Sequence, residues 1–563
     1  MASCQKLLQD GYYRDSLSVC SKAVDITREK RGLNSKLTAW SLVHYSKALY
    51  SMDQLEESLQ MSSIVSSILG SDEFQGDQSA EELLIENHLI SSQVYLKRSM
   101  LNEASLSIST ASSLLSSNAR NESPLVYSLL QLQTAQLFEH KGQLLEAVES
   151  FTRAIHCIEA VNPSDYRPPQ LKRLQLVKAE AHYHLGLLYV ELGVLQGIRN
   201  NLDQTIQIRK DLLDSNHPDM ADALDSMAVL LFMSGNLAGP LPLLDKAHRI
   251  RVDRLGNKHT RVAQSYFLRA FILEHVGDIK KAQNLHRRGF HIIREVLGND
   301  HPDLATPYAA MARYALAKNE FEPAGKWLSK AIEIREKHFG DSHPRVLVLR
   351  MDQARMLMRQ AKYLQAKSVL TQVKKVLSQD PQHQKLNLSK INRFLYKIFI
   401  LEGDTKKAKE LLYEALQMMR ESLGIDHPQV GSLLQEVVGL HHDRKEYEAA
   451  VILLREYTDQ LIENNSRDHP EVLPRLTLLI FMEQMALNWS EAVAGFEVLL
   501  DIQRRNFGSA HPEVAKTLIS MGALHRKLDN LEEAEKFEKE ARLINMGGNP
   551  EDKDILFAPW QKK

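Results

Sequence analysis

The chain has 563 residues, and its 70 lysines and arginines are balanced by 71 aspartates and glutamates. This balance excludes a general electrostatic attraction to nucleic acid or to an anionic membrane, so local surfaces must select the partners. The three cysteines, Cys4, Cys20 and Cys157, have neither the number nor the spacing of a disulfide framework or a zinc site, which predicts a reducing, cytoplasmic location. No run of about 18 uncharged apolar residues occurs, so no membrane insertion is expected.

The first part of the chain, residues 1–160, has a weak helical repeat. Turn-forming and small residues recur at similar intervals, at 11–16, 53–58, 99–104 and 142–147. The serine-rich stretch from Ser105 to Ser123 has leucines and alanines at helical spacing, which favours a helix over a phosphorylated linker. We therefore expect irregular N-terminal helical repeats, and the first unit has room only for a short first helix.

Residues 161–173 interrupt the repeat. The equivalent positions Ala147 and Ile198 are 51 residues apart, and the segment 161–170 between them contains three prolines. A proline cluster stops a helix and stiffens the connection. The sequence therefore predicts a proline-containing linker between two sub-arrays.

A regular array follows at residues 174–545, with a period of forty-two residues. Histidine precedes proline at His217, His301, His343, His427, His469 and His511. His259 stands before Thr260 in one gap of this series, and Lys385 occupies the other. A period of about 20 to 50 residues is typical of a repeat array, in which each unit buries its apolar face against its neighbours.

Each unit of the array reads as helix, turn, helix, and thirteen units can be counted along the chain. The predicted turn positions are Gly193, Gly235, Gly277, Asn319, Ala361, Gly403, Lys445, Leu487 and Asp529. Five residues later, seven of nine positions are alanine, which allows close helix contact. Gly298, Gly340, Gly424 and Gly508 suit helix ends, and the prolines suit helix starts. We expect the histidines to be solvated and not to bind metal, because no second ligand recurs beside them.

Residues 546–563 leave the repeat pattern after Gly547, so we expect a flexible C-terminal tail. Glu551, Asp552 and Asp554 precede Leu556, Phe557 and Trp560, as in an acidic aromatic peptide. One hypothesis is that the tail occupies its own groove, and deletion of 552–563 would then raise the affinity for a partner. The alternatives are a cap on the last helix or no fixed structure.

The stretches Lys330–Val346 and Glu414–Val430 resemble the forty-two-residue tetratricopeptide repeats of kinesin light chains. The resemblance covers roughly residues 174–544. It implies an all-α fold, a right-handed α-solenoid in which the first helix of each unit lines the concave face. Kinesin light chains hold a cargo peptide with an Asn-Asn-Leu-Ala stretch on this helix. Here 225–228 reads Asp-Ser-Met-Ala and no heptad segment precedes the array, so motor binding and that mode of capture are not carried over.

The register predicts which side chains face the groove, at positions eight and twelve after each histidine. Position twelve reads Val229, Phe271, Arg313, Arg355, Lys397, Gly439, Phe481 and Ala523. Arg313, Arg355 and Lys397 form a run of cations, to which Arg393 and Lys390 add, and this run predicts an anionic partner. Phe271 and Phe481 flank the run and are candidate anchors. Ordinary solvated charges and core phenylalanines are the alternative interpretation.

No phosphate-binding glycine loop, nucleophile elbow or metal-spaced His and carboxylate pair occurs, so we expect neither an enzyme nor a cofactor. RNA binding by a helical repeat needs a basic surface over many units, and nucleic acid is not the expected ligand. The sequence predicts a protein-interaction scaffold or adaptor that binds a peptide or protein partner, possibly acidic, in its concave groove. The alternatives are a motor-cargo adaptor of the kinesin light chain type and a helical-repeat RNA-binding protein.

Overall fold

The structure is a computed structural model that describes residues 2–115, 123–192, 195–233, 236–379, 381, 384–465, 467, 469 and 471–546. The chain is 84% helical, and its described residues form 26 α-helices and no strand. These helices make thirteen consecutive pairs, which confirms the predicted all-α helical-repeat solenoid. No described helix is long and apolar enough to cross a membrane. The tail hypothesis concerns residues that lie, except for Met546, outside the described part.

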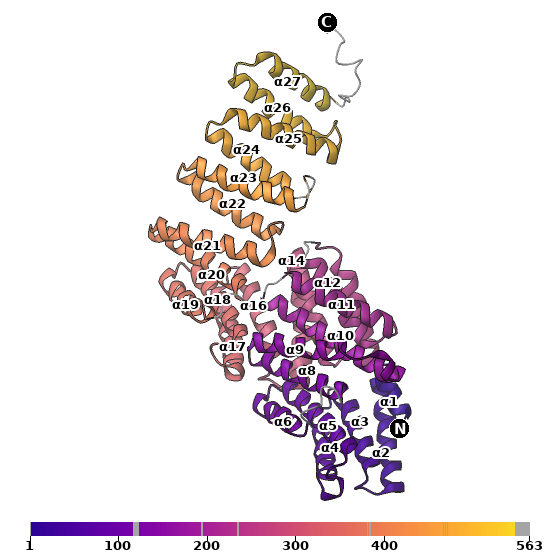
Figure 1. The fold of residues 1–563 in the computed structure, drawn as a ribbon. Helices are drawn as coiled ribbons and strands as arrows, with labels where there is room; N and C mark the ends of the chain where they lie inside the picture. Colours follow the sequence, from indigo (N-terminus) through magenta and orange to yellow (C-terminus); the bar gives the residue numbers. More distant parts are fainter. Residues whose placement is uncertain are drawn as a thin grey trace. The chain divides into compact units, whose positions relative to one another are not determined.

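The helices pack as two units, Met1–Asn387 and Leu388–Lys563 (Figure 1). The helices of the first unit are α1 (Ala2–Gln9), α2 (Tyr13–Arg31), α3 (Lys36–Ser51), α4 (Leu55–Leu69), α5 (Gln78–Lys97), α6 (Leu101–Ser113), α8 (Pro124–His140), α9 (Leu144–Glu159), α10 (Pro168–Leu192), α11 (Leu195–Leu212), α12 (Pro218–Met233), α13 (Pro240–Leu255), α14 (Thr260–Val276), α15 (Ile279–Leu297), α16 (Ala305–Ala317), α17 (Phe321–Phe339), α18 (Pro344–Arg359) and α19 (Tyr363–Leu377). The boundary between the units falls in the first turn of α20 (Lys385–Glu402).

The second unit continues from α20 with α21 (Thr405–Leu423), α22 (Pro428–Asp443), α23 (Tyr447–Asn464), α24 (Val472–Met485), α25 (Trp489–Phe507), α26 (Pro512–Lys527) and α27 (Leu531–Asn545). Its pairs follow one another as a simple stack (Figure 1). In the first unit, α6 covers residues 105–113 of the serine-rich stretch in which a helix is predicted, and residues 116–122 lie outside the described part. An apolar cluster with Phe151 and Leu188 joins α8, α9 and α10 across the proline-containing segment 161–173.

In each pair whose turn residue lies in the described part of the chain, the turn contains one residue with positive φ, at the position that the period predicts. At the predicted turn positions of the array and at Gly11, Asp53, Ser99 and Gly142 before it, the described residues have φ between 58° and 94°. All non-glycine residues of the described part with positive φ are in this set: Asp53, Ser99, Asn319, Ala361, Lys445, Leu487 and Asp529. Gly193 and Gly235 lie outside the described residues. The helix-turn-helix register is therefore confirmed.

Close contact between the paired helices depends on the small residues that follow each turn. The seven alanines are all 0% exposed: Ala282, Ala324, Ala366, Ala408, Ala450, Ala492 and Ala534. Gly289 shows how little room remains, because a Cβ atom there would lie 2.4 Å from Cε1 of Phe267. Between pairs, Gly298 has φ 95° and ψ 176° after the end of α15, a combination open only to glycine.

The histidines that precede the helices are N-caps. In all seven, Nδ1 accepts a hydrogen bond from the backbone N–H two residues later, at 3.1 to 3.3 Å. The prediction that these histidines are solvated is wrong for the first four, which are buried: His217, His259, His301 and His343. They are buried because the first unit coils back on itself.

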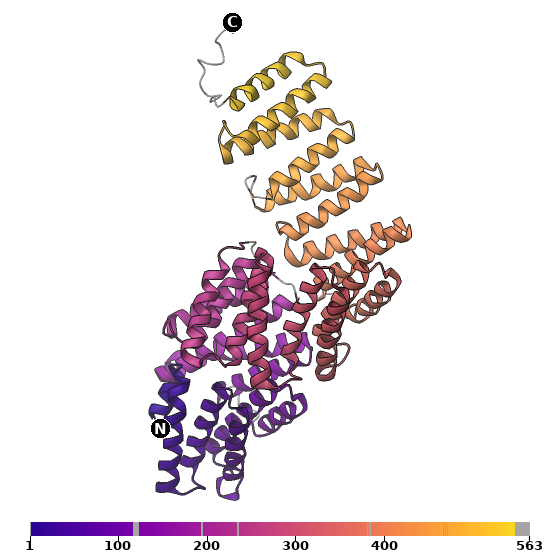
Figure 2. The same ribbon diagram turned by 180° about the vertical axis from the view of Figure 1, so that it is seen from behind.

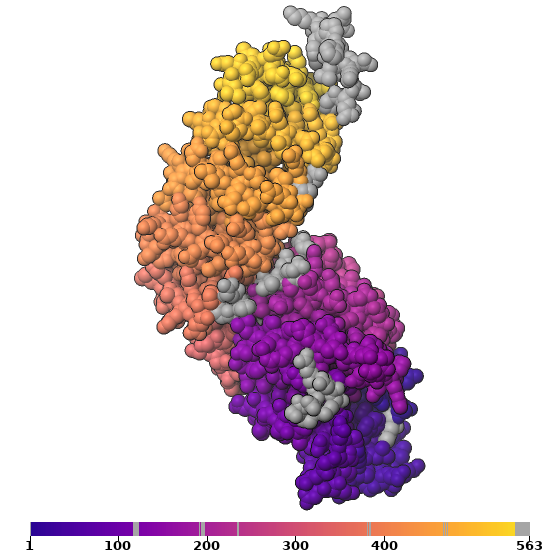
Figure 3. All heavy atoms as spheres, in the orientation of Figure 1, coloured from indigo at the N-terminus to yellow at the C-terminus, as the bar shows by residue number. Residues whose placement is uncertain are grey.

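In this coil, each of the first four pairs lies against the pair five positions later. The turn at Gly11 meets Pro218, and the turn at Gly142 meets Pro344. Figures 1 and 2 show the first helices beside the later repeats from opposite sides, and Figure 3 shows the indigo residues lying directly against magenta ones. Arg345 also pairs with Glu139 across this contact, at 3.0 Å.

The first two helices are linked covalently, because Cys4 of α1 and Cys20 of α2 form a disulfide. Both sulfur atoms are buried in a small cluster with Leu8 and Ala48. This bond was not expected from the number and spacing of the cysteines, which predicted a reducing location. Cys157, the remaining cysteine, is a buried thiol on α9.

Candidate functional site

The candidate partner-binding residues lie on the first helices of their pairs, but the structure does not gather them into one site. Phe271, Arg313 and Arg355 belong to the first unit, and Lys390, Arg393, Lys397 and Phe481 belong to the second. Each group is therefore described within its own unit.

Arg313 on α16 forms part of a hydrogen-bonded cluster with Glu274 of α14. Its guanidinium lies 3.0 Å from the Glu274 carboxylate, which also accepts hydrogen bonds from Tyr314 at 2.5 Å and from His286 at 3.0 Å. Burial by itself would raise the pKa of Glu274, but the bonds from His286 and Tyr314 and the Arg313 charge lower it to about 2. Arg313 therefore has a structural partner within the fold.

The other two candidates of the first unit are more exposed. Arg355 on α18 is 49% exposed and lies 3.4 Å from Asp352, one turn earlier. Phe271 on α14 is 41% exposed, and its ring contacts those of Phe232 and His275 at centroid distances of 5.3 and 4.5 Å. The Phe271 side chain is therefore partly exposed to solvent and partly packed against the rings of Phe232 and His275.

In the second unit, the cations of α20 converge on one carboxylate. Arg393 donates two hydrogen bonds to Glu436 of α22, at 2.6 and 2.9 Å, and Lys397 lies 3.8 Å from the same carboxylate. Lys390 is exposed one turn earlier on the same helix. Arg393 and Lys397 of α20 thus share a single glutamate.

Phe481 lines a groove on the first helices of the last two pairs. This groove of 360 Å³ lies between α24, α25 and α26, and Phe481 is 46% exposed at its edge. Its lining consists of Thr477, Ile480, Phe481, Gln484, Phe496, Ser520, Ala523, Leu524 and Lys527. Lys527 is the one charged residue of that lining, and its ammonium group lies 5.0 Å from the centre of the Trp489 ring. The groove is apolar with a cation at one end.

The forty-two-residue period predicts only part of the lining of this groove. Phe481 and Ala523 are the position-twelve residues of this lining. Lys527 was missed although it follows Ala523 by one helical turn, where it lies on the same helix face. Phe496 was not predicted because it belongs to the second helix of its pair, whereas the register was applied only to the first helices.

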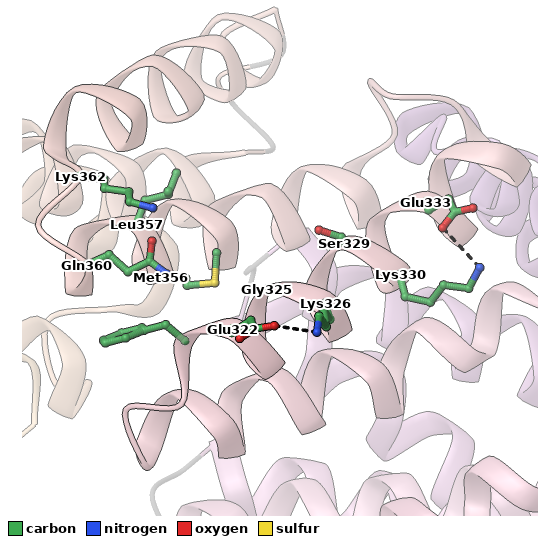
Figure 4. A pocket seen from close by; sticks show the side chains of 11 residues that line it. Glu322, Gly325, Lys326, Ser329, Lys330, Glu333, Met356, Leu357, Gln360 and Lys362 are labelled. Carbon is green, nitrogen blue, oxygen red and sulfur yellow. Dashed lines mark hydrogen bonds and ion pairs between the residues drawn. The ribbon is translucent and has the colours of Figure 1, made fainter.

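A second groove, of 580 Å³, lies in the first unit along α17 (Figure 4). Phe321, Met356 and Leu357 supply its apolar part. Its charged residues largely pair with one another, since Lys326 lies 2.7 Å from Glu322 and Lys330 lies 3.3 Å from Glu333. This groove therefore has mixed charge and offers no clear electrostatic preference.

Asp225, which corresponds to an asparagine of kinesin light chains, belongs to a salt-bridge cluster of the fold. Asp225 is buried, and its carboxylate lies 2.6 Å from Arg251, which also binds Asp222 at 2.5 Å. Arg261 of α14 contacts Asp222 at 2.5 Å as well. These carboxylates are committed to arginines of the fold and are not available to hold a peptide backbone.

Together, the paired helices and the turn register define a helical-repeat solenoid of the tetratricopeptide type. Residues 183–219, 261–337 and 402–429 match family models described as tetratricopeptide repeat. A kinesin light chain type is not specifically indicated by these matches.

The chain is also similar to fungal proteins named clustered mitochondria protein homolog. The protein of Emericella nidulans is 26% identical over 144 residues, which are 25% of this chain and 12% of that protein. The protein of Aspergillus niger is 26% identical over 144 residues, 25% of this chain and 11% of the relative. The similarity thus spans about a tenth of the length of these curated relatives.

Two solved structures show a likeness of fold alone. A Rap protein complexed with competence and sporulation factor has 12% identity and a TM-score of 0.48, over 68% of this chain and 98% of the other. The human IFIT1 dimer with m7Gppp-AAAA has 15% identity and a TM-score of 0.40, over 88% and 94% of the two chains.

Proposed function

We propose that this protein is an interaction scaffold whose second unit binds a segment of a partner protein. The observation that carries the proposal is the groove at Phe481, an apolar depression with a single charged residue in its lining. A preformed groove on a repeat array binds with little loss of conformational entropy. In this proposal an apolar side chain of the partner enters beside Phe481 and Ile480, and an adjacent carboxylate pairs with Lys527.

The cations of α20 extend the same proposal to an acidic partner. Arg393 and Lys397 share Glu436 as an acidic neighbour, and Lys390 is exposed on the same helix, so a partner carboxylate would meet several cations there. In the first unit, Phe271 and Arg355 stay candidates for a second contact, whereas Arg313 is held by Glu274. A cytoplasmic location belongs to the proposal as well, and the Cys4–Cys20 disulfide is the observation that speaks against it.

A peptide display library screened against the full chain tests this function. We expect selected peptides to combine a large apolar residue with a nearby aspartate or glutamate. Phe481→Ala should weaken their binding by about tenfold, as for an interface anchor. Ile452→Ala is the matched control, because Ile452 is 68% exposed in the same unit but lies on α23, away from the groove.

Two outcomes would contradict the proposal. Equal losses for the Phe481 and Ile452 variants would show that the groove has no special role. Enrichment of basic peptides, or retention of nucleic acid alone by the full chain, would overturn an acidic protein partner.

A further inference from the structure

Four of the capping histidines make a second hydrogen bond that spans about half of the first unit. Nε2 of His217 donates to the carbonyl of Gln9 at 3.2 Å, and Nε2 of His259 donates to that of Ser51 at 3.0 Å. The equivalent bonds are His301 to Lys97 at 2.8 Å and His343 to His140 at 3.2 Å. The partners are 203 to 208 residues apart in sequence.

Each of these rings is held in one protonation state by its two bonds. Nδ1 must carry a lone pair to accept the backbone N–H, and Nε2 must carry a proton to reach the carbonyl. A second proton, on Nδ1, would point at the backbone N–H that now donates to this atom, so two donors would oppose each other. It would also place a positive charge inside the contact between the repeats. The neutral ring is therefore a requirement of this geometry and follows from the bonds alone.

The charged groups around the first two rings do not remove this requirement. His217 faces Asp219 at 3.7 Å together with the more distant Arg261 and Arg209. His259 faces Asp53 at 3.5 Å, but Lys97 already forms an ion pair with that carboxylate, and Arg261 adds a further positive charge. Burial lowers the pKa of both histidines, that of His259 to about 4.

The other two rings lie in more positive surroundings. His301 has Asp303 at 3.8 Å, and His338 and His140 are its other titratable neighbours. His343 faces Arg345, Arg335 and His140, and Glu139, the nearby carboxylate, is paired with Arg345. Burial lowers the pKa of both, that of His343 to about 4.

We propose that these four histidine–carbonyl bonds form an acid-sensitive clasp that holds the first four helix pairs against the later pairs and releases them when the rings are protonated. Release opens the coil without unfolding the pairs, because each pair keeps its own turn and the packing of its two helices against each other. The surfaces that separate are those around the turns at Gly11 and Gly142 and the helix starts at Pro218 and Pro344.

Hydrogen–deuterium exchange of the full chain, corrected for intrinsic rates, tests the clasp at about pH 7.5 and about pH 5. We expect the turn at 139–143 and the start of α18 to exchange about tenfold faster at the lower pH, as for a lost hydrogen bond of ordinary strength. Circular dichroism should show unchanged helix content over the same range.

His343→Asn and His511→Asn make a matched pair of variants. Both histidines cap a helix at 3.1 and 3.2 Å, and both stack on a phenylalanine at 4.7 and 4.9 Å. Asparagine keeps the cap but does not titrate and is too short to reach the distant carbonyl. His343→Asn should give fast exchange at 139–143 at both pH values, whereas His511→Asn should leave this turn unchanged.

Equal protection of 139–143 at both pH values would overturn the proposal. So would equal exchange at this turn in the two variants, because the histidines would then act only as caps. If His343→Asn lowers the helix content, His301→Asn serves as the second variant, with the turn at 97–100 as its reporter.

Discussion

At the scale of single residues, backbone strain in the turns varies along the array while the turn geometry stays constant. Leu487 has φ 65° and is 67% exposed, so its side chain contributes little packing there. Gly403 occupies the equivalent turn with φ 81°, and a Cβ atom there would meet no atom within 4 Å. The second unit therefore contains a relaxed version of this turn at Gly403 and strained versions at its non-glycine turn residues, such as Leu487.

Substitutions at these turns should change stability in opposite directions. Leu487→Gly should stabilise the second unit by about 1 kcal/mol, and Gly403→Ala should destabilise it by about 1 kcal/mol, since an L-residue at positive φ costs roughly that much. Urea unfolding monitored by circular dichroism measures both. Gly439→Ala is the control, because Gly439 is exposed inside α22 and alanine favours a helix interior, so this variant should gain stability.

The predictability of single residues depended on whether their role is local. The turn residues and the buried alanines follow from the period because their contacts lie within one helix pair. The burial of His217 and the pairing of Arg313 with Glu274 depend on how neighbouring and distant pairs meet, which the period does not specify. The sequence does contain one sign of the contact between distant pairs, because Thr260 follows His259 where proline follows the other six capping histidines.

At the scale of elements, the short helix α1 depends on contacts beyond its own length. It has eight residues, too few for a stable isolated helix. The disulfide to α2 and the His217 bond to Gln9 hold its two ends. The free energy that keeps α1 folded therefore comes from these contacts and from the apolar cluster around Cys20.

Removing the disulfide should loosen α1 selectively. For a sequence separation of 16 residues, the loss of the cross-link costs at most about 3 kcal/mol. We expect Cys4→Ser to increase amide exchange in residues 2–12 while α3 stays protected. Cys157→Ser is the control, because this thiol is not in a disulfide. Protection of residues 2–12 equal to that of the unaltered chain would contradict the expected role.

At the scale of the whole molecule, the histidines with lowered pKa are distributed unevenly between the two units. Burial lowers the pKa of eight histidines in the first unit: His44, His88, His182, His217, His248, His259, His301 and His343. In the second unit the same direction is found for His441. The two units should therefore differ in their response to acid.

Calorimetry should detect two unfolding transitions, of which the one belonging to the first unit falls in temperature as the pH is lowered. The unfolded histidines have pKa values of about 6.5, above the folded values, so the unfolded state binds more protons. The stabilisation is complete above about pH 6.5 and is lost as the pH falls toward about 4. A parallel shift of both transitions between about pH 6.5 and pH 5 would contradict this assignment.

The contact around His259 has a consequence for how the array can change in length. The N–H of Thr260 donates to Asp53 at 2.7 Å, whereas glycines stand opposite Pro218 and Pro344, where no N–H exists. Loss of one repeat between these partners would place a proline opposite Asp53 and Thr260 opposite the glycine of the first turn. The pairing of Thr260 with Asp53 therefore constrains the number of repeats in this stretch. The helix pairs of the second unit follow one another as a simple stack (Figure 1) and have no equivalent constraint among their described residues.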